Sequence, residues 1–128
     1  GVISVFLGRV ARDLPIVVLG DGKIVRDYID VDDLVSAAKM AAVTVTENSV
    51  FNISSGCGVS LNELIELIRS VTNKPVHINY LPARLSDVPA IVLDPRRAHD
   101  ELGWKPQTSF PESVKKTWSW VKSLKWLE

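Results

Sequence analysis

Short runs of β-forming residues alternate along this chain with longer segments in which apolar residues recur at helical spacing. The runs lie at residues 16–19, around Arg26, and at 50–53 and 74–81, each beside turn residues. The other segments favour helices at 2–13, 34–43, 61–73, 95–102 and 111–127. Alternating strands and helices pack as layers. A chain of 128 residues suits one domain with a modest core, so we expect a single α/β (α+β) domain over residues 1–128.

Two of the expected helices begin with capping signals. Either Asp32 or Asp33 is expected to cap the helix at 34–43, because a carboxylate oxygen can accept a free N–H of the first turn. Ser60 and Glu63 form a capping box before the helix at 61–73. That helix carries one apolar stripe, which predicts packing against a core.

Composition argues against several classes of protein. Lys and Arg together number 15, as do Asp and Glu, so the chain has no basic excess that would favour nucleic acid. No apolar run approaches the roughly 20 residues that span a bilayer. Cys57 is the only cysteine, which fits a reducing, cytoplasmic location. His77 and His99 have no cysteine pair beside them, so we expect no metal site.

The glycines do not form a dinucleotide-binding loop. Such a loop needs G-x-G-x-x-G after a strand. Gly20 and Gly22 give only G-D-G-K-I-V, and Gly56 and Gly58 give only G-C-G-V-S-L, so both pairs are interpreted as turns. A Walker lysine motif is also absent from the sequence. We therefore expect this chain to bind no dinucleotide by itself.

Arg26 stands in the apolar stretch "GKIVRDYIDVDD", where an unpaired charge is costly to bury. One interpretation is an ion pair with Asp27 or another carboxylate. The other is an anion site, because a guanidinium binds phosphate in a bidentate fork. Arg84 lies in the irregular loop at 82–90, with Asp87 three residues on. Two arginines and an aspartate could hold a diphosphate and a ribose hydroxyl, and spacing alone leaves both interpretations open.

Four segments together resemble a known family. They are "GDGKIVRDYIDVDDL", "FNISSGCGVSLNELIELI", "YLPARLSDVP" and "ELGWKPQTSFPESVKKTWSW". In this order they resemble the C-terminal half of NAD-dependent nucleotide-sugar epimerases and dehydratases, which are extended short-chain dehydrogenases/reductases. UDP-glucose 4-epimerase is the nearest type. The resemblance covers nearly the whole chain and implies a small substrate-binding domain from an enzyme of carbohydrate metabolism.

The resemblance also implies a division of labour. In the family, an N-terminal Rossmann half holds NAD and carries G-x-x-G-x-x-G and the catalytic Tyr-x-x-x-Lys. In this chain Tyr28 and Tyr80 are followed four residues later by Asp32 and Arg84, not by lysine. We therefore expect no catalytic residue, no cofactor bound by this chain alone and no hydride chemistry from it, with NAD belonging to the parent enzyme.

The family pattern assigns the substrate-binding residues one by one. It implies that Arg26 and Arg84 contact the diphosphate of a nucleotide sugar and that Asp87 lies near the ribose hydroxyls. The backbone around Val17 and Leu19 would flank the nucleotide base. The substrate implied is a UDP-sugar.

Three positions depart from the family pattern. Asp30 stands where the family has Tyr or His, and it would repel a substrate phosphate if it faced the pocket. Ser54 and Ser86 each replace a glycine, which matters only where the backbone needs a positive φ.

The chain opens with Gly-Val-Ile inside a helical pattern, so we expect a truncated protein or an excised domain. The partners implied are a nucleotide sugar and either the missing Rossmann half or a second copy packed on the exposed face. Two alternatives stay open: a stand-alone nucleotide-binding or regulatory module, and a structural, self-associating protein derived from the family.

Overall fold

The structure, a computed structural model, describes residues 1–47 and 50–124 and divides into two compact units. The first unit comprises Gly1–Ile24, Ser60–Pro89 and the residues from Pro111 onward. The second comprises Val25–Val59 and Ala90–Phe110. Each unit combines helices with short strands, in agreement with the α/β (α+β) class expected from the sequence.

The first unit contains a parallel pair of strands, β1 (Ile16–Leu19) and β4 (Ile78–Leu81). The register runs from Ile16 opposite Ile78 to Leu19 opposite Leu81. On β1 the side chains alternate, with Ile16 and Val18 buried and Val17 and Leu19 on the other face. The strand expected at 74–81 is thus confirmed over its second half.

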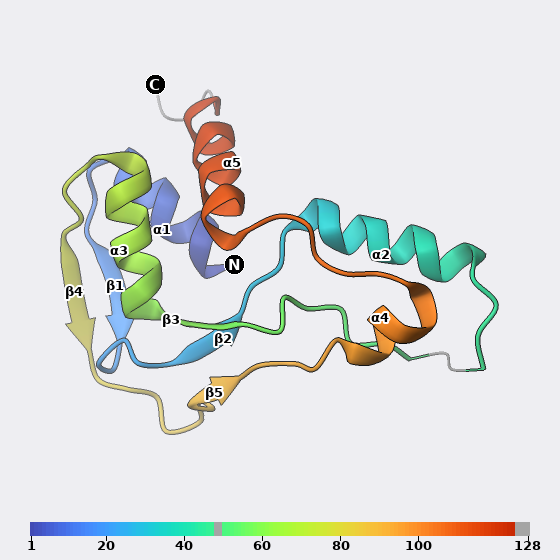
Figure 1. The fold of residues 1–128 in the computed structure, drawn as a ribbon. Helices are drawn as coiled ribbons and strands as arrows, with labels where there is room; N and C mark the ends of the chain where they lie inside the picture. Colours follow the sequence, from blue (N-terminus) through green and yellow to red (C-terminus); the bar gives the residue numbers. More distant parts are fainter. Residues whose placement is uncertain (48–49, 125–128) are drawn as a thin grey trace. The chain divides into compact units, whose positions relative to one another are not determined.

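Three helices complete the first unit: α1 (Val2–Ala11), α3 (Leu61–Thr72) and α5 (Phe110–Lys122). Figure 1 shows α1 and α3 beside the two strands. Residues 125–128, part of the helix expected at 111–127, lie outside the described residues. The inward faces of the three helices bury Phe6, Leu7, Val10, Leu64, Ile65, Ile68, Val114, Trp118 and Val121.

The start of α3 is joined to the glycine turn that follows β1. The capping box is present as expected, with the Ser60 hydroxyl accepting from the Glu63 amide and the Glu63 carboxylate accepting from the Ser60 amide. The amides of Leu61 and Asn62 donate to the carbonyls of Ile24 (3.2 Å) and Gly22 (3.0 Å). The first amides of α3 are therefore occupied by the chain itself.

The second unit contains a three-stranded sheet in the order β3-β2-β5. Its strands are β2 (Val25–Asp27), β3 (Gly58–Ser60) and β5 (Ala90–Ile91). β2 and β5 are parallel, with Val25 opposite Ala90 and Arg26 opposite Ile91. Although the loop at 82–90 was expected to be irregular, its last residue begins β5. A strand of two residues has no periodicity that a sequence pattern could reveal.

The core of the second unit lies between α2 (Val31–Val43) and α4 (Arg96–Leu102). Its buried residues are Ala37, Ala98, Leu102 and Trp104, and Ile29, Met40, Phe51 and Ile53 pack against them. The indole nitrogen of Trp104 donates to the Asp33 carbonyl (3.1 Å) and the Ser36 hydroxyl (2.9 Å), so its one polar atom is satisfied.

The N-cap of α2 is Asp30, so the expectation of Asp32 or Asp33 was wrong. Asp30 has extended backbone angles, and its carboxylate accepts from the Asp32 amide at 2.9 Å. Asp33 is buried for a different reason: its carboxylate accepts from the amides of Gln107 (3.1 Å) and Thr108 (2.9 Å). It ties the segment after α4 to the first turn of α2.

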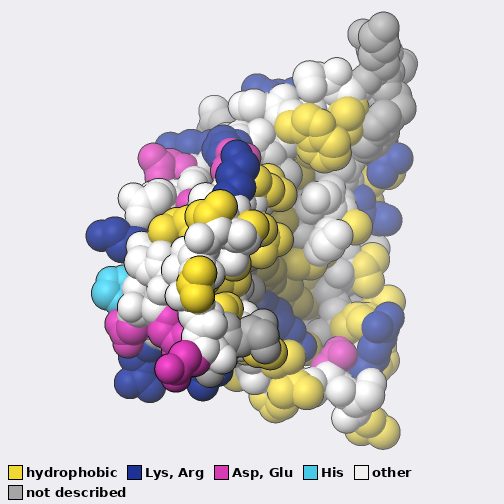
Figure 2. All heavy atoms as spheres, turned by 90° about the vertical axis from the view of Figure 1, so that its right-hand side faces the viewer, with side chains coloured by type: hydrophobic (Ala, Val, Ile, Leu, Met, Phe, Trp, Pro, Cys, Tyr) yellow, Lys and Arg dark blue, Asp and Glu magenta, His cyan; other side chains and the backbone are white. Residues whose placement is uncertain are grey.

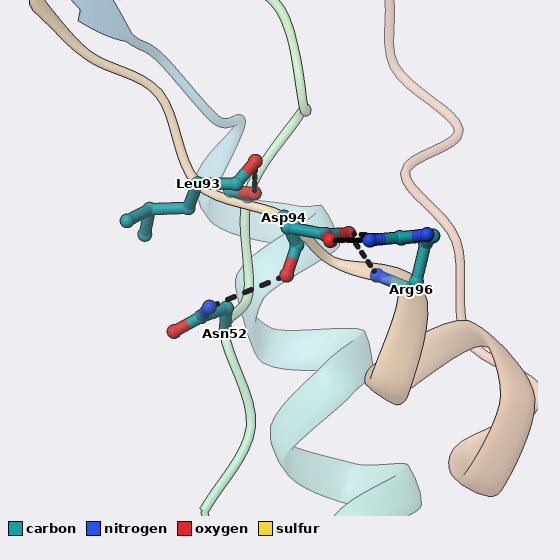
Figure 3. A network of polar contacts seen from close by, with 5 residues as sticks. Asn52, Leu93, Asp94 and Arg96 are labelled. Carbon is teal, nitrogen blue, oxygen red and sulfur yellow. Dashed lines mark hydrogen bonds and ion pairs between the residues drawn. The ribbon is translucent and has the colours of Figure 1, made fainter.

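The strand expected at 50–53 is not formed. Phe51 and Ile53 turn toward the core, while Val50 and Asn52 are exposed, as in a strand. Among the described residues, however, no backbone–backbone hydrogen bond joins this segment to another. Its contacts run through side chains, such as the Asn52 amide on the Asp94 carbonyl (3.3 Å; Figure 3). A strand needs a second backbone, which the described residues do not supply here.

The surface that carries α2 and α4 is mixed in character. Figure 2, which turns the right-hand side of Figure 1 toward the viewer, shows basic and acidic side chains interspersed with hydrophobic ones around α4. The exposed apolar residues of α2 are Val31, Leu34, Val35 and Val43. Within the described part of the chain, the helices are too short or too polar to cross a membrane.

Candidate functional site

Arg26 lies at the centre of β2 and is half-buried. Its Nη1 donates to the carbonyl of Val25 at 2.7 Å. The side chain also influences Tyr28, because its positive charge works to lower the pKa of that phenol. The sequence prediction that Arg26 sits on a strand is confirmed. Its role toward a phosphate stays a prediction.

Tyr28 packs its ring on Phe110, with ring centroids 5.3 Å apart and planes inclined by 18°. Its hydroxyl is buried without a hydrogen-bond partner among the described residues. Burial raises the pKa of this phenol above its ordinary value of 10.0, and the smaller effect of Arg26 opposes the rise. Tyr28 is therefore a packing residue that carries an unsatisfied oxygen.

Asp27 points its carboxylate at two other segments of the second unit. Oδ1 accepts from the amide (2.9 Å) and hydroxyl (2.6 Å) of Ser55, and Oδ2 accepts from the amides of Gly56 (3.0 Å) and Leu93 (3.3 Å). Sequence reasoning missed this role and treated Asp27 only as a possible ion-pair partner of Arg26. No local pattern could have revealed it, because the donors lie 28, 29 and 66 residues away along the chain.

Val17 and Leu19 belong to the first unit and lie on the face of β1 that its core does not cover. Val17 is 36% exposed, and their partners on β4, Asn79 and Leu81, are exposed too. Parallel strands are usually covered on both faces. This pair therefore offers a small face, apolar at Val17, Leu19 and Leu81 and polar at Asn79, on which a flat ring could lie.

Arg84 and Asp87 lie in one turn of the loop after β4. The Asp87 amide donates to the Arg84 carbonyl at 3.2 Å, and Arg84 is exposed. This loop starts beside the end of β1, where a Cβ on Gly20 would lie 3.2 Å from the Cβ of Ala83. The structure thus brings the start of the Arg84 loop to the end of the strand that holds Val17 and Leu19. Arg26 belongs to the other unit, so its proximity to Arg84 stays a prediction.

The three departures from the family pattern have local explanations. Asp30 is buried and its carboxylate caps α2, a role that keeps this oxygen on the helix. Ser54 is buried, and its hydroxyl donates to the Leu93 carbonyl at 3.4 Å. Neither Ser54 nor Ser86 has a positive φ, so serine is accommodated without backbone strain.

The described residues contain no cluster of three or more His, Cys, Asp or Glu side chains that could hold a metal ion. His77 and His99 are both exposed, and the Nδ1 of His99 lies 2.9 Å from the Asp100 carboxylate. Cys57 is an exposed, free thiol.

The second unit has a surface hollow of about 250 Å³ lined by Val50, Asn52, Asp94 and Arg97. In Figure 3 the Asp94 carboxylate points away from Asn52 and toward Arg96, which donates to it at 2.8 Å. These hydrogen bonds hold the pKa of Asp94 below its ordinary value. Its carboxylate is engaged with a neighbour, and none of the five predicted binding residues lines this hollow.

Comparison with known proteins gives a consistent result. The family profile described as GDP-mannose 4,6 dehydratase matches residues 2–117. The dTDP-4-dehydro-6-deoxyglucose reductase of Escherichia coli is 34% identical over 125 residues, which is 98% of this chain and 39% of that protein.

Two solved structures share the fold. The UDP-glucose 4-epimerase of Thermotoga maritima, solved with UDP-glucose, superposes with a TM-score of 0.92 at 38% identity, over 100% of this chain and 40% of that one. The UDP-glucose 4-epimerase of Thermus thermophilus, solved with NAD, gives 0.86 at 26% identity, over 95% and 40%. The chain thus spans about two fifths of the length of these proteins.

Proposed function

Since this chain belongs to the family of NAD-dependent nucleotide-sugar epimerases and dehydratases, we propose that it supplies the nucleotide-sugar-binding part of such an enzyme. The substrate class we propose is a UDP-sugar. The similar Thermotoga maritima enzyme was solved with UDP-glucose, which supports that choice. The observation that carries the proposal is Arg26, a half-buried arginine at the centre of β2 whose Nη1 donates to the Val25 carbonyl.

Each proposed contact has a chemical reason. A guanidinium offers donors in a planar fork that fits the oxygens of a diphosphate, and partial burial strengthens the attraction. Arg84 would add a second positive charge from its exposed loop. The Asp87 carboxylate can accept hydrogen bonds from ribose hydroxyls. The apolar face at Val17 and Leu19 suits a planar base, whose polar edge would meet the backbone of β1.

The residues present do not fit NAD. The chain contains no G-x-x-G-x-x-G turn, and neither tyrosine is followed by lysine at the fourth position. The amides of Leu61 and Asn62 at the start of α3 already donate to the carbonyls of Ile24 and Gly22, so they are not available to a phosphate. We therefore derive no hydride step for this chain. Its contribution to a reaction would be binding energy from groups remote from the reacting carbon, which helps hold that carbon in place.

A second candidate is a self-associating protein that has kept the fold without the site. The observation that favours it is the exposed apolar surface of α2 and of the β1–β4 pair. A third is a stand-alone nucleotide-binding module. It would bind the same ligand as our main proposal and differ only in lacking a catalytic partner.

An NMR titration of the 128-residue chain with UDP, UDP-glucose and GDP tests the proposal. We expect saturable shifts in residues 17–27 and 84–87. Arg26→Ala and Arg84→Ala should each weaken UDP binding by roughly tenfold or more, because a hydrogen bond to a charged group contributes about 1.5–3 kcal/mol.

Arg96→Ala is the matched control. Arg96 is an exposed arginine whose side chain is engaged with the Asp94 carboxylate, so its loss should leave the affinity unchanged. No shifts up to millimolar ligand, on a chain with a dispersed spectrum, would contradict the proposal and favour the self-associating protein. Tighter binding of GDP than of UDP would contradict the choice of uridine.

A further inference from the structure

The Asp27 carboxylate joins three segments of the second unit that are far apart in sequence. It receives four hydrogen bonds, from Ser55 (two), Gly56 and Leu93. The Ser55–Gly56 donors lie 28 and 29 residues away along the chain, and Leu93 lies 66 residues away. A single side chain at the end of β2 therefore holds a loop on one side and the segment after β5 on the other.

These bonds matter because the sheet around β2 is small. The ladder between β2 and β5 consists of two residue pairs, Val25–Ala90 and Arg26–Ile91. So short a pairing fixes a strand weakly by itself. Asp27 comes directly after the last pair, and the Leu93 amide on its Oδ2 extends the connection between the two strands.

On its other side, β2 is held to the loop at Ser55 and Gly56 by the same carboxylate. Two successive amides, Ser55 and Gly56, point at the carboxylate, an arrangement typical of a backbone anion nest. Gly56 has a φ of +74°, which glycine adopts at little cost. Further along, a Cβ on Gly58 would lie 2.5 Å from Val25 and 2.7 Å from Val92. The start of β3 thus approaches β2 closely, and Asp27 supplies the charge that the amides of Ser55 and Gly56, just before β3, face.

Arg26 and Asp27 are neighbours on one strand, so their side chains leave it on opposite faces. Any rotation or slide of β2 would move both. The network around Asp27 therefore determines the backbone position from which the Arg26 guanidinium extends. A donor that must meet a phosphate in a bidentate fork tolerates little misplacement, and its affinity depends on being ordered before the ligand arrives.

We propose that Asp27 is a positioning residue for Arg26: by fixing both sides of β2 it orders the guanidinium toward a ligand diphosphate. The ligand part of this inference rests on the function proposed above. The ordering of Arg26 does not, since it is a property of the free chain.

The first test needs no ligand. The ¹⁵N heteronuclear NOE of the Arg26 Nε–H reports the mobility of the guanidinium, and it should fall clearly in Asp27→Asn. Asp94→Asn is the matched control: it removes a carboxylate of the same unit that is engaged with Arg96, and the Arg26 signal should not change. An unchanged NOE in a folded Asp27→Asn chain would overturn the inference, whatever the chain binds.

The second test separates positioning from general loss of structure. In Asp27→Asn the affinity for UDP should fall about tenfold, whereas any affinity for uridine, which lacks the diphosphate, should stay the same. In an Arg26→Ala background, Asp27→Asn should cause no further loss for UDP. Equal losses for both ligands, or the same tenfold loss without Arg26, would reduce Asp27 to a structural role.

Ser55→Ala covers the case in which Asp27→Asn does not fold. It removes one of the four bonds to Asp27, the 2.6 Å contact from the hydroxyl, and leaves the three amide donors in place. It also removes the contacts of that hydroxyl with the amide and carbonyl of Cys57 in the same turn. A smaller fall of the same NOE is expected, and its absence would count against the inference. If the unaltered chain bound no UDP while the NOE responded as expected, the proposed function would fail and the positioning of Arg26 would stand.

Discussion

At the scale of single residues, Tyr28 both stabilises the fold by packing and destabilises it through an unsatisfied hydroxyl. Its ring stacks on Phe110, while its hydroxyl is buried without a partner among the described residues. An unsatisfied buried hydroxyl costs free energy that the ring contact must offset.

Tyr28→Phe should therefore leave the free energy of unfolding unchanged or raise it by up to about 1 kcal/mol, since it removes the oxygen and keeps the ring. Tyr28→Ala should lower it by about 3 kcal/mol through loss of the aromatic contact. Urea denaturation of the three chains gives both values. A loss of more than 1 kcal/mol in Tyr28→Phe would mean that the hydroxyl has a partner in solution.

Sequence reasoning at this scale identified residue types better than their partners. It singled out Arg26 because a charge inside an apolar run is unusual. It could not find the contacts of Asp27, because Ser55 and Leu93 are brought to it by the fold. It also chose the wrong cap for α2: three aspartates within four positions carry the same local signal, and only the backbone angles of Asp30 distinguish it.

At the scale of elements, α3 is the helix whose ends the sequence defined most fully. Both hydrogen bonds of its capping box are present, and Asn73 ends it in the left-handed conformation. The hydrogen bonds from the Ser60 hydroxyl and amide hold the pKa of Glu63 below its ordinary value of 4.5. A carboxyl group whose pKa is lowered in the folded state stabilises that state above its unfolded pKa, and loses this contribution as the pH falls through its folded pKa.

Glu63→Gln should consequently destabilise the chain at pH 7 and have little effect once the pH is below the lowered pKa of Glu63. Thermal unfolding of both chains between pH 7 and pH 3 measures the difference. Glu66→Gln, on the exposed surface of the same helix, is the control: it removes a carboxylate and its ion pair with Arg69 but leaves the capping box intact. A difference between the Glu63→Gln and unaltered chains that did not shrink in acid would contradict an ionised capping box.

The strands were harder to predict than the helices, for a physical reason. A helix satisfies its backbone within one segment, so local patterns define it. A strand depends on a neighbour that can lie anywhere in the chain. Ile16–Leu19 pairs with Ile78–Leu81. Residues 50–53 have an equally good pattern of β-forming residues, but they pair with no other backbone among the described residues.

At the scale of the whole molecule, the family and fold were predictable from four motifs in order. The arrangement of the two units as one substrate-binding domain remains a prediction. The chain spans about two fifths of its relatives' length, and apolar side chains are exposed on both units. We expect the isolated chain to self-associate at high concentration, and residues 50–53, which pair with no other backbone among the described residues, are one segment through which it could do so.

Val50→Lys tests that expectation. Val50 is 69% exposed in a segment that pairs with no other backbone among the described residues, and a lysine there should discourage pairing with another chain, as lysine does on edge strands. Sedimentation velocity over a hundredfold range of concentration should show larger species for the unaltered chain and mainly monomer for Val50→Lys. Val43→Lys, on α2 and 82% exposed, tests the apolar surface of α2 in the same way: a monomer in Val43→Lys but not in Val50→Lys would place the contact on α2. Equal association of all three chains would place the contact elsewhere.

The lack of a backbone partner for residues 50–53 among the described residues has one more consequence, for how this molecule's thermodynamics should be measured. If a second chain occupies that edge, unfolding also requires dissociation, and mass action then raises the melting temperature with protein concentration. A single melting curve would mix intrinsic stability with the free energy of association. Only the dilute limit, or Val50→Lys, would report the energy of one chain folding alone.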